Sequence, residues 1–142
     1  MKFKTLSTLL LSTAMLAGCD HPDKPDVTII PGVVLTVKVN HIGDTLIGEF
    51  LPATSTQSIF EQAQASVSAE LIKGKCAVGF PLTWDAKSKR HYASVGVISC
   101  DGIERIEAPV TLVESSTRMN GLPALALGDE ILVLFTKQTH VK

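Results

Sequence analysis

The chain of 142 residues has few of the features that mark an enzyme or a nucleic-acid-binding protein. It contains no G-x-S-x-G nucleophile turn, no H-E-x-x-H zinc motif and no phosphate-binding loop. Its four histidines and three cysteines do not occur at the spacing of metal ligands. With 13 basic against 14 acidic residues, it has no net positive charge that would attract nucleic acid. We therefore expect no enzymatic activity, no metal or other cofactor, and no nucleic-acid partner.

An apolar run near the start, Leu6–Leu16, is too short to span a bilayer stably. Two lysines precede the run, and it ends in the sequence Leu16-Ala17-Gly18-Cys19. This pattern resembles the signal of bacterial lipoproteins. The resemblance implies that residues 1–18 are removed and that Cys19 carries several acyl chains, such as palmitate, each methylene of which contributes roughly 0.8 kcal/mol when buried. The alternative is an ordinary secretory signal followed by an unmodified cysteine.

Asp20 follows the cysteine directly, and an aspartate there resembles the signal that keeps lipoproteins of enteric-type bacteria in the inner membrane. We therefore expect a lipid-anchored protein on the periplasmic face of the inner membrane, with the outer membrane as the alternative. Removal of residues 1–18 leaves 142 minus 18, or 124 residues, which suits one domain. Two lysines leave with the signal, so 13 minus 2, or 11, basic residues face 14 acidic ones, a net charge of −3.

Residues 19–32 are polar and rich in proline, and we expect them to form a lipidated N-terminus and an extended tether. Residues 33–142 make up the predicted β-domain. Within it, apolar residues alternate with others in the series Val33, Leu35, Val37, Val39, in the series Leu46, Gly48, Phe50, and in the series Ile106, Ala108, Val110, Leu112. About seven short strands with turn signals between them predict an all-β domain, either a small barrel or a sandwich. Pro109 favours an edge position or a bulge in its strand.

The segment between residues 54 and 73 fits two interpretations. We favour a loop or short helix to Ala65, capped by one of the residues Thr54, Ser55 and Thr56, followed by a strand over Ser66–Lys73. The alternative is a single helix over Ser58–Lys73.

Cys76 and Cys100 remain after lipidation, and an oxidising compartment makes a disulfide the default state. The bond would close a loop of about 25 residues and contribute on the order of 3.5 kcal/mol in the chain-entropy model. Two free thiols or a metal pair are the alternatives. Antiparallel pairing that sets Cys76 opposite Cys100 also sets Val78 opposite Ile98 and Phe80 opposite Gly96. A two-residue turn at Asp101-Gly102 would then lead to the next strand.

The only tryptophan and the only tyrosine flank a basic loop. Aromatic residues and arginine are enriched in the parts of interfaces that contribute most to binding. The possible partner contacts in this loop are Trp84, Lys87, Lys89, Arg90 and Tyr92. The simpler interpretation, which we favour, is a polar hairpin tip with Trp84 and Tyr92 packed at its base.

Several short motifs are spread along the chain: Gly43-Asp44-Thr45-Leu46-Ile47-Gly48-Glu49, Lys75-Cys76, Trp84-Asp85, Ser88, Arg90, Ser99-Cys100-Asp101-Gly102 and Ala108-Pro109-Val110. Together they resemble the carboxy-terminal barrel of TraB-type proteins, which belong to the outer-membrane core complex of conjugative type IV secretion systems. The resemblance covers residues 33–125. This chain departs from the family in having a lipid in place of a membrane helix, a short arm, and no helical insertion.

The resemblance implies a lipid-anchored structural or assembly component of a conjugation-type secretion or pilus-assembly machine, whose partners are protein subunits. We expect exposed strand edges, the basic loop and the segment Ile29-Ile30 to provide the contacts. The alternative function is that of a small periplasmic binding, inhibitor or entry-exclusion lipoprotein.

Overall fold

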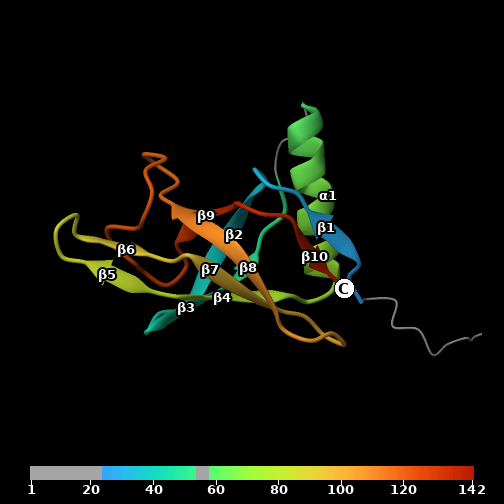
Figure 1. Ribbon diagram of the computed structural model, residues 1–142, viewed down its shortest axis with the longest axis horizontal. Helices are drawn as coiled ribbons and strands as arrows, with labels where there is room; N and C mark the ends of the chain where they lie inside the picture. Colours follow the sequence, from blue (N-terminus) through green and yellow to red (C-terminus); the bar gives the residue numbers. More distant parts are fainter. Residues whose placement is uncertain (1–23, 54–57) are drawn as a thin grey trace, which may run out of the picture.

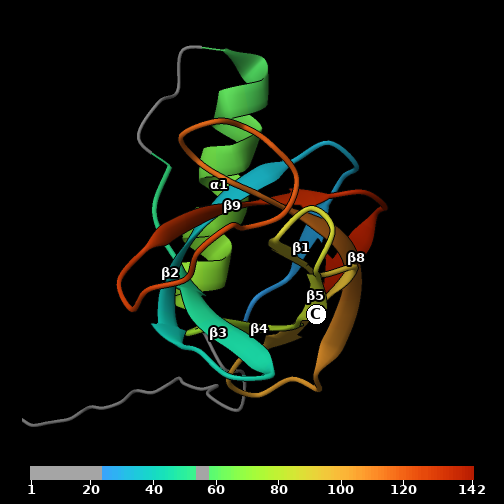
Figure 2. The same cartoon turned by 90° about the vertical axis from the view of Figure 1, so that its left-hand side faces the viewer.

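The alternating segments of the sequence form the wall of a closed antiparallel barrel. The computed structural model describes residues 24–53 and 58–142, and six strands close the barrel within this part of the chain (Figures 1 and 2). In the order of their pairing they are β2 (Val34–His41), β3 (Thr45–Phe50), β4 (Ala77–Pro81), β7 (Val95–Ser99), β8 (Ile106–Val113) and β9 (Glu130–Phe135). β9 pairs with β2 and completes the ring. Of the two predicted architectures, the structure confirms the barrel.

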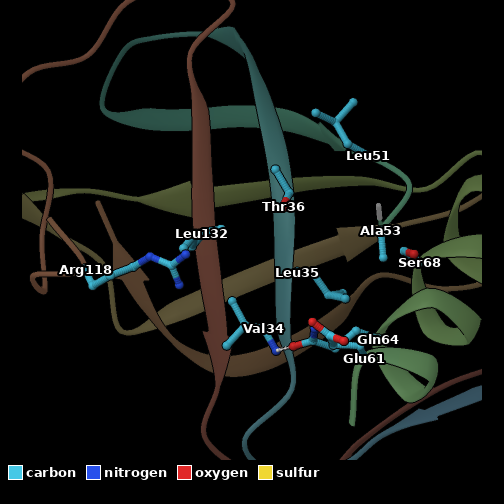
Figure 3. A pocket seen from close by; sticks show the side chains of 10 residues that line it. All are labelled: Val34, Leu35, Thr36, Leu51, Ala53, Glu61, Gln64, Ser68, Arg118 and Leu132. Carbon is cyan, nitrogen blue, oxygen red and sulfur yellow. Dashed lines mark hydrogen bonds between the residues drawn. The ribbon is translucent and has the colours of Figure 1, made fainter. Parts of the chain in front are cut away.

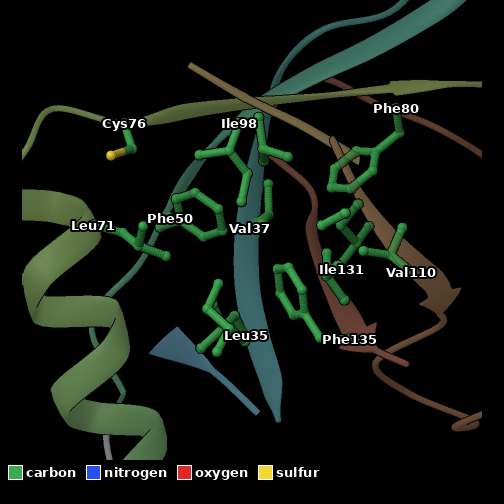
Figure 4. Packing of buried hydrophobic residues seen from close by; sticks show 14 of the residues in the cluster. Leu35, Val37, Phe50, Leu71, Cys76, Phe80, Ile98, Val110, Ile131 and Phe135 are labelled. Atoms are coloured by element: carbon green, nitrogen blue, oxygen red, sulfur yellow. The ribbon is translucent and has the colours of Figure 1, made fainter. Parts of the chain in front are cut away.

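The inward-facing residues of the strands fill the interior, as the alternation predicts. Along β2 and β3 the residues at every second position are buried and those between them are more exposed. Figure 4 shows Phe50 and the helix residue Leu71 on one side of this core and Phe80 and Phe135 on the other. A Cβ atom at Gly96 would lie 2.9 Å from the ring of Phe80, so the glycine provides the space that this ring occupies.

Residues Ile59–Lys73 form one helix, α1, so the predicted strand over Ser66–Lys73 is wrong and the alternative helix is confirmed. Ser58 caps it: the Glu61 N–H donates to the Ser58 hydroxyl and the Ser58 N–H to the Glu61 carboxylate, both at 3.0 Å. Val67, Ser68 and Leu71 are buried, which is the three-and-four spacing of one helix face. The alternation of Val67, Ala69 and Leu71 is too short to distinguish the period of a strand from that of a helix, whereas the Ser58-x-x-Glu61 capping box specifies a helix.

The predicted tether contains a strand that belongs to the domain. β1 (Val27–Ile29) pairs antiparallel with β10 (Thr139–Val141), so the prediction of a tether over residues 19–32 is wrong for this segment. Ile29 is fully buried and cannot offer the predicted contact, while Ile30 is exposed. A three-residue strand next to prolines is too short to show a period in sequence, and only its partner at the other end of the chain reveals it.

The predictions that concern the membrane fall on residues outside the described part: the signal of residues 1–18, Cys19 and Asp20. The candidate caps Thr54, Ser55 and Thr56 lie outside it as well. Within the described residues, no helix has both the length and the apolar character needed to cross a membrane.

The structure confirms the disulfide between Cys76 and Cys100. The register of β4 and β7 sets Val78 opposite Ile98, as predicted. The turn that follows is longer than predicted, because Ile98 also pairs with Ile106 and residues 100–105 connect the two strands. The N–H of Asp101 donates to the carbonyl oxygen of Gly74 at 3.2 Å instead of closing a tight turn.

Pro109 lies neither in an edge strand nor at a bulge, the two predicted positions, because β8 pairs with β7 on one side and with β9 on the other without a shift in register. The N–H of Thr136 donates to the Pro109 carbonyl oxygen at 3.1 Å, just beyond the last residue of β9. Because proline has no N–H, only the bond from Pro109 back to β9 is missing. This position is at the end of β9, so the proline disturbs the ladder of hydrogen bonds little.

The barrel has two differently built ends (Figure 1). At the terminal end lie α1, β1, β10 and the disulfide, and both ends of the described chain are there. At the opposite end, which we call the hairpin end, three connections project: residues 42–44, the β5–β6 hairpin (Thr83–Asp85 and Arg90–Tyr92), and residues 114–129. Figure 2 views the barrel from the hairpin end.

Candidate functional site

The predicted basic loop is the tip of the β5–β6 hairpin, which extends β4 and β7 beyond the barrel wall. Asp85 closes the tip. Its carbonyl oxygen accepts the Lys89 N–H at 2.8 Å, and its carboxylate accepts the N–H groups of Lys87 and Ser88 at 3.3 and 3.2 Å. The hydrogen bond of the Ser88 side chain, followed by these backbone bonds, lowers the pKa of Asp85. The tip is therefore a defined turn that holds two lysines in solvent.

Arg90 joins the hairpin to the connection between β8 and β9. Its guanidinium donates to the Glu114 carboxylate at 2.8 Å, to the Asn120 carbonyl oxygen at 2.9 Å and to the Gly121 carbonyl oxygen at 3.0 Å. Only 13% of the Arg90 side chain is exposed. The hydrogen bond from Thr117, followed by that from Arg90, lowers the pKa of Glu114. Sequence reasoning did not identify Glu114, because no local pattern shows which loop the hairpin contacts.

The two aromatic residues of the hairpin have different surroundings. Tyr92 packs over Gly121, where a Cβ atom would lie 2.6 Å from the tyrosine ring, and its hydroxyl donates to the Ser88 hydroxyl at 3.1 Å. Trp84 lies with its ring centre 4.6 Å from that of His91 and is 50% exposed. Of the five predicted contact residues, Arg90 and Tyr92 thus hold the hairpin in place, while Trp84, Lys87 and Lys89 face solvent.

Of the eight large apolar side chains that are exposed among the described residues, four lie at the hairpin end. The four large ones in its connections and hairpin are Ile42, Trp84, Met119 and Leu127. Apolar and aromatic side chains beside a few charges are typical of surfaces that bind proteins. The hairpin end therefore has the composition of a contact surface, presented on loops that are tied to a rigid barrel.

A second feature is a groove on the outer side of β2 and β9, with a volume of about 420 Å³ (Figure 3). Val34, Thr36 and Leu132 form its floor, and residues of α1 form one wall. The α1 residue Gln64 accepts the N–H of Val34 through its side-chain oxygen at 3.1 Å. The outer face of β9 is thus only partly covered here, since Leu132 borders the groove.

Arg118 reaches this groove from the connection between β8 and β9, and its side chain extends toward Leu132 (Figure 3). Within the part of the chain that the structure describes, its guanidinium has no ion pair or side-chain hydrogen bond. The backbone of Arg118 has a φ of 63°, the left-handed region that non-glycine residues seldom adopt. Sequence reasoning did not single out Arg118, because its position beside β9 depends on the fold of a long connection.

At the terminal end, a hydrogen bond links Asp26, the residue before β1, to His140 of β10. His140 Nε2 lies 2.8 Å from the carboxylate of Asp26, and this hydrogen bond lowers the pKa of Asp26. The histidines at 41, 91 and 140 lie on three separate strands. Among residues 24–53 and 58–142, no group of three or more histidine, cysteine or acidic side chains is placed to hold a metal ion.

The chain was compared with known protein families, with curated proteins and with solved structures, and it matches none of them. The resemblance to TraB-type barrels therefore rests on the sequence motifs alone. In the structure, the motif residues Trp84-Asp85, Ser88 and Arg90 come together on the β5–β6 hairpin, and Ser99-Cys100-Asp101-Gly102 lies at the disulfide.

Proposed function

We propose that the protein is a lipid-anchored assembly component of a conjugation-type type IV secretion or pilus-assembly machine. In this proposal, acyl chains on Cys19 hold it at the periplasmic face of a bacterial membrane, the inner membrane by the rule for Asp20. The barrel then presents its hairpin end to protein subunits. The observation that carries the proposal is the polarity of the barrel: both ends of the described chain lie opposite the exposed hairpin (Figure 1).

The length of chain before β1 fits this arrangement. Seven residues separate Cys19 from Val27, and a chain of that length spans at most about 25 Å. A lipid at Cys19 would therefore keep the terminal end close to the membrane surface. The hairpin end would then point away from the membrane, toward other periplasmic components.

The hairpin end is also suited to binding because it is pre-organised. Arg90 and Tyr92 fix the hairpin against the connection of residues 114–129, so little conformational entropy is lost when a partner binds. The exposed tryptophan supplies a large apolar surface of the kind that dominates interface energies. Lys87 and Lys89 flank it with positive charge.

A photo-crosslinking amino acid tests which end of the barrel contacts a partner. It is placed at Lys87 on the hairpin end or, as a matched control, at Lys137 on the terminal end, since both lysines are exposed. In cells that carry a conjugative transfer system, we expect a discrete crosslinked protein from position 87 that co-purifies in a large membrane complex after gentle detergent extraction. Equal crosslinking from both positions, or none from position 87, would contradict the proposal.

The lipid anchor is tested separately with Cys19→Ser. We expect this variant to leave the membrane or to remain unprocessed, and to take up no radioactive palmitate. A mature, detergent-requiring Cys19→Ser protein would remove the anchor from the proposal. If the wild-type protein, expressed alone in a recipient cell, blocks DNA entry, it acts as an entry-exclusion lipoprotein and not as an assembly component.

A further inference from the structure

The groove of Figure 3 lies where the barrel wall opens between β2 and β3. The two strands pair as far as Val37 and Phe50, and the Leu51 N–H still donates to the Thr36 carbonyl oxygen at 2.9 Å. Pro52 then follows, and the chain turns away toward α1. The start of β2 therefore has no neighbouring strand on this side, and the side chain of Gln64 takes up the N–H of Val34 instead.

The start of β2 has few backbone groups left for a ligand, because the Val34 N–H is bonded to Gln64 and the Thr36 carbonyl oxygen to the Leu51 N–H. An extended peptide would therefore be held mainly by pockets that receive its side chains and by its charged end. The groove volume of about 420 Å³ falls within the range of small-ligand sites, and its floor is apolar at Val34 and Leu132. Gln64 lines the groove with a side-chain amide whose oxygen is bonded to the Val34 N–H, which leaves its NH₂ group as a donor, whereas the hydroxyl of the buried Ser68 donates to the Ala65 carbonyl oxygen at 3.1 Å.

The charges at the two ends of the groove differ in sign. Arg118 lies at one end and the carboxylate of Glu61 at the other (Figure 3). The Arg118 guanidinium has no partner among the described residues, and a guanidinium binds a carboxylate through strong charge-assisted hydrogen bonds. A ligand with a terminal carboxylate would therefore be oriented with that group at Arg118 and its remaining residues across β9 and β2 toward α1 (Figure 3).

We propose that this groove binds an extended peptide segment that ends in a carboxylate, with the carboxylate held by Arg118. The C-terminal tail of a partner protein has this chemistry. Peptide binding in the groove requires neither the acyl anchor nor the exposed face of the hairpin. A result that contradicts the proposed function therefore does not contradict this inference, and the reverse also holds.

The experiment uses the full chain in detergent micelles, labelled with nitrogen-15. The probe is a library of acetylated pentapeptides, synthesised once with a free C-terminal carboxylate and once with a C-terminal amide. We expect the free-carboxylate library to shift the backbone amide signals of Val34 and Thr36 and the side-chain amide signals of Gln64. We expect the amidated library to bind at least tenfold more weakly, because it lacks the charge that Arg118 recognises.

Two variants assign the effect to the guanidinium. Arg118→Gln is expected to bind the free-carboxylate library about tenfold more weakly and the amidated library unchanged, while Arg118→Lys regains part of the difference. The matched control is Arg105→Gln, since Arg105 is an exposed arginine in the connection between β7 and β8. An equal response to the two libraries, or shifts that map outside the groove at millimolar peptide, would overturn the proposal.

Discussion

The guanidinium of Arg90 lies 2.8 Å from the carboxylate of Glu114, and this contact ties two projections of the barrel into one surface. The two residues are 24 positions apart and belong to different strand connections. Next to them, His91 and Leu122 exchange two backbone hydrogen bonds of 2.8 Å. The hairpin is therefore a fixed part of the hairpin end, and the surface proposed to bind subunits is defined by this packing.

Replacing Arg90 by alanine should release the hairpin without unfolding the barrel. The variant loses three hydrogen bonds to the connection of residues 114–129. Bonds from a charged group are worth more than neutral ones, so we expect amide hydrogen exchange at His91 and Leu122 to become about tenfold faster. Lys89→Ala, at the exposed tip, should leave both rates unchanged. Protected amides at these two positions in the Arg90→Ala protein would show that the hairpin is held by other contacts.

The helix cap at Ser58 should be measurable as stability. Ser58→Ala removes the oxygen that accepts the Glu61 N–H, and we expect a loss of about 1 kcal/mol in urea unfolding. Ser66→Ala is the matched control, because Ser66 is an exposed residue within the same helix and alanine favours helix by a few tenths of a kcal/mol. Similar effects of the two substitutions would exclude a specific capping role.

Removing the disulfide should destabilise the barrel at its terminal end. We expect the double variant Cys76→Ala, Cys100→Ala to lose about 3 kcal/mol in urea unfolding, since the bond restricts the unfolded chain. A reductant should lower the stability of the wild type toward that of the variant and leave the variant unaffected. Peptide mass mapping under non-reducing conditions gives an independent test, and recovery of both thiols unmodified would disprove the bond.

Gly48 marks a close approach of β3 to β2. A Cβ atom there would lie 2.5 Å from the carbonyl oxygen of Lys38, and backbone cannot move aside cheaply. We expect Gly48→Ala to cost about 2 to 3 kcal/mol. Gly79→Ala is the control, because the nearest contact of its Cβ would be a methyl group of Thr45 at 3.3 Å, and the other atoms lie at 3.9 Å or more. A Gly48→Ala protein as stable as the Gly79→Ala protein would show that the strands separate easily at this point.

The pair of Asp26 and His140 should affect stability at acidic pH. The hydrogen bond from His140 lowers the pKa of Asp26 from its ordinary value, so the folded state favours the ionised carboxylate. The contribution is present above the unfolded-state pKa and is lost as the pH falls through the folded-state value. Carbon-13 NMR titration should give a depressed pKa for Asp26 that returns to its ordinary value in His140→Ala. If the pKa of Asp26 is the same in that variant as in the wild type, the two side chains do not interact in solution.

Much of the barrel wall could be predicted because its strands have one face in the core and one outside. The alternation along β2, β3 and β8 has a period of two, and this period identifies the inward residues without knowledge of the fold. The register of β4 and β7 could also be predicted, because Cys76 and Cys100 fix it.

Other features depend on contacts between distant parts of the chain. The sequence by itself determined the buried faces of β2, β3 and β8, the disulfide, and the polar hairpin with its basic tip. Only the tertiary structure decided between barrel and sandwich, because closure depends on the pairing of β2 with β9. The tertiary structure likewise showed that residues 27–29 pair with β10, that Arg90 forms an ion pair with Glu114, and that Arg118 faces a groove. The reason is physical: a local period reports which side of a strand is apolar, whereas the partner of a short strand or a long side chain is set by the path of the whole chain.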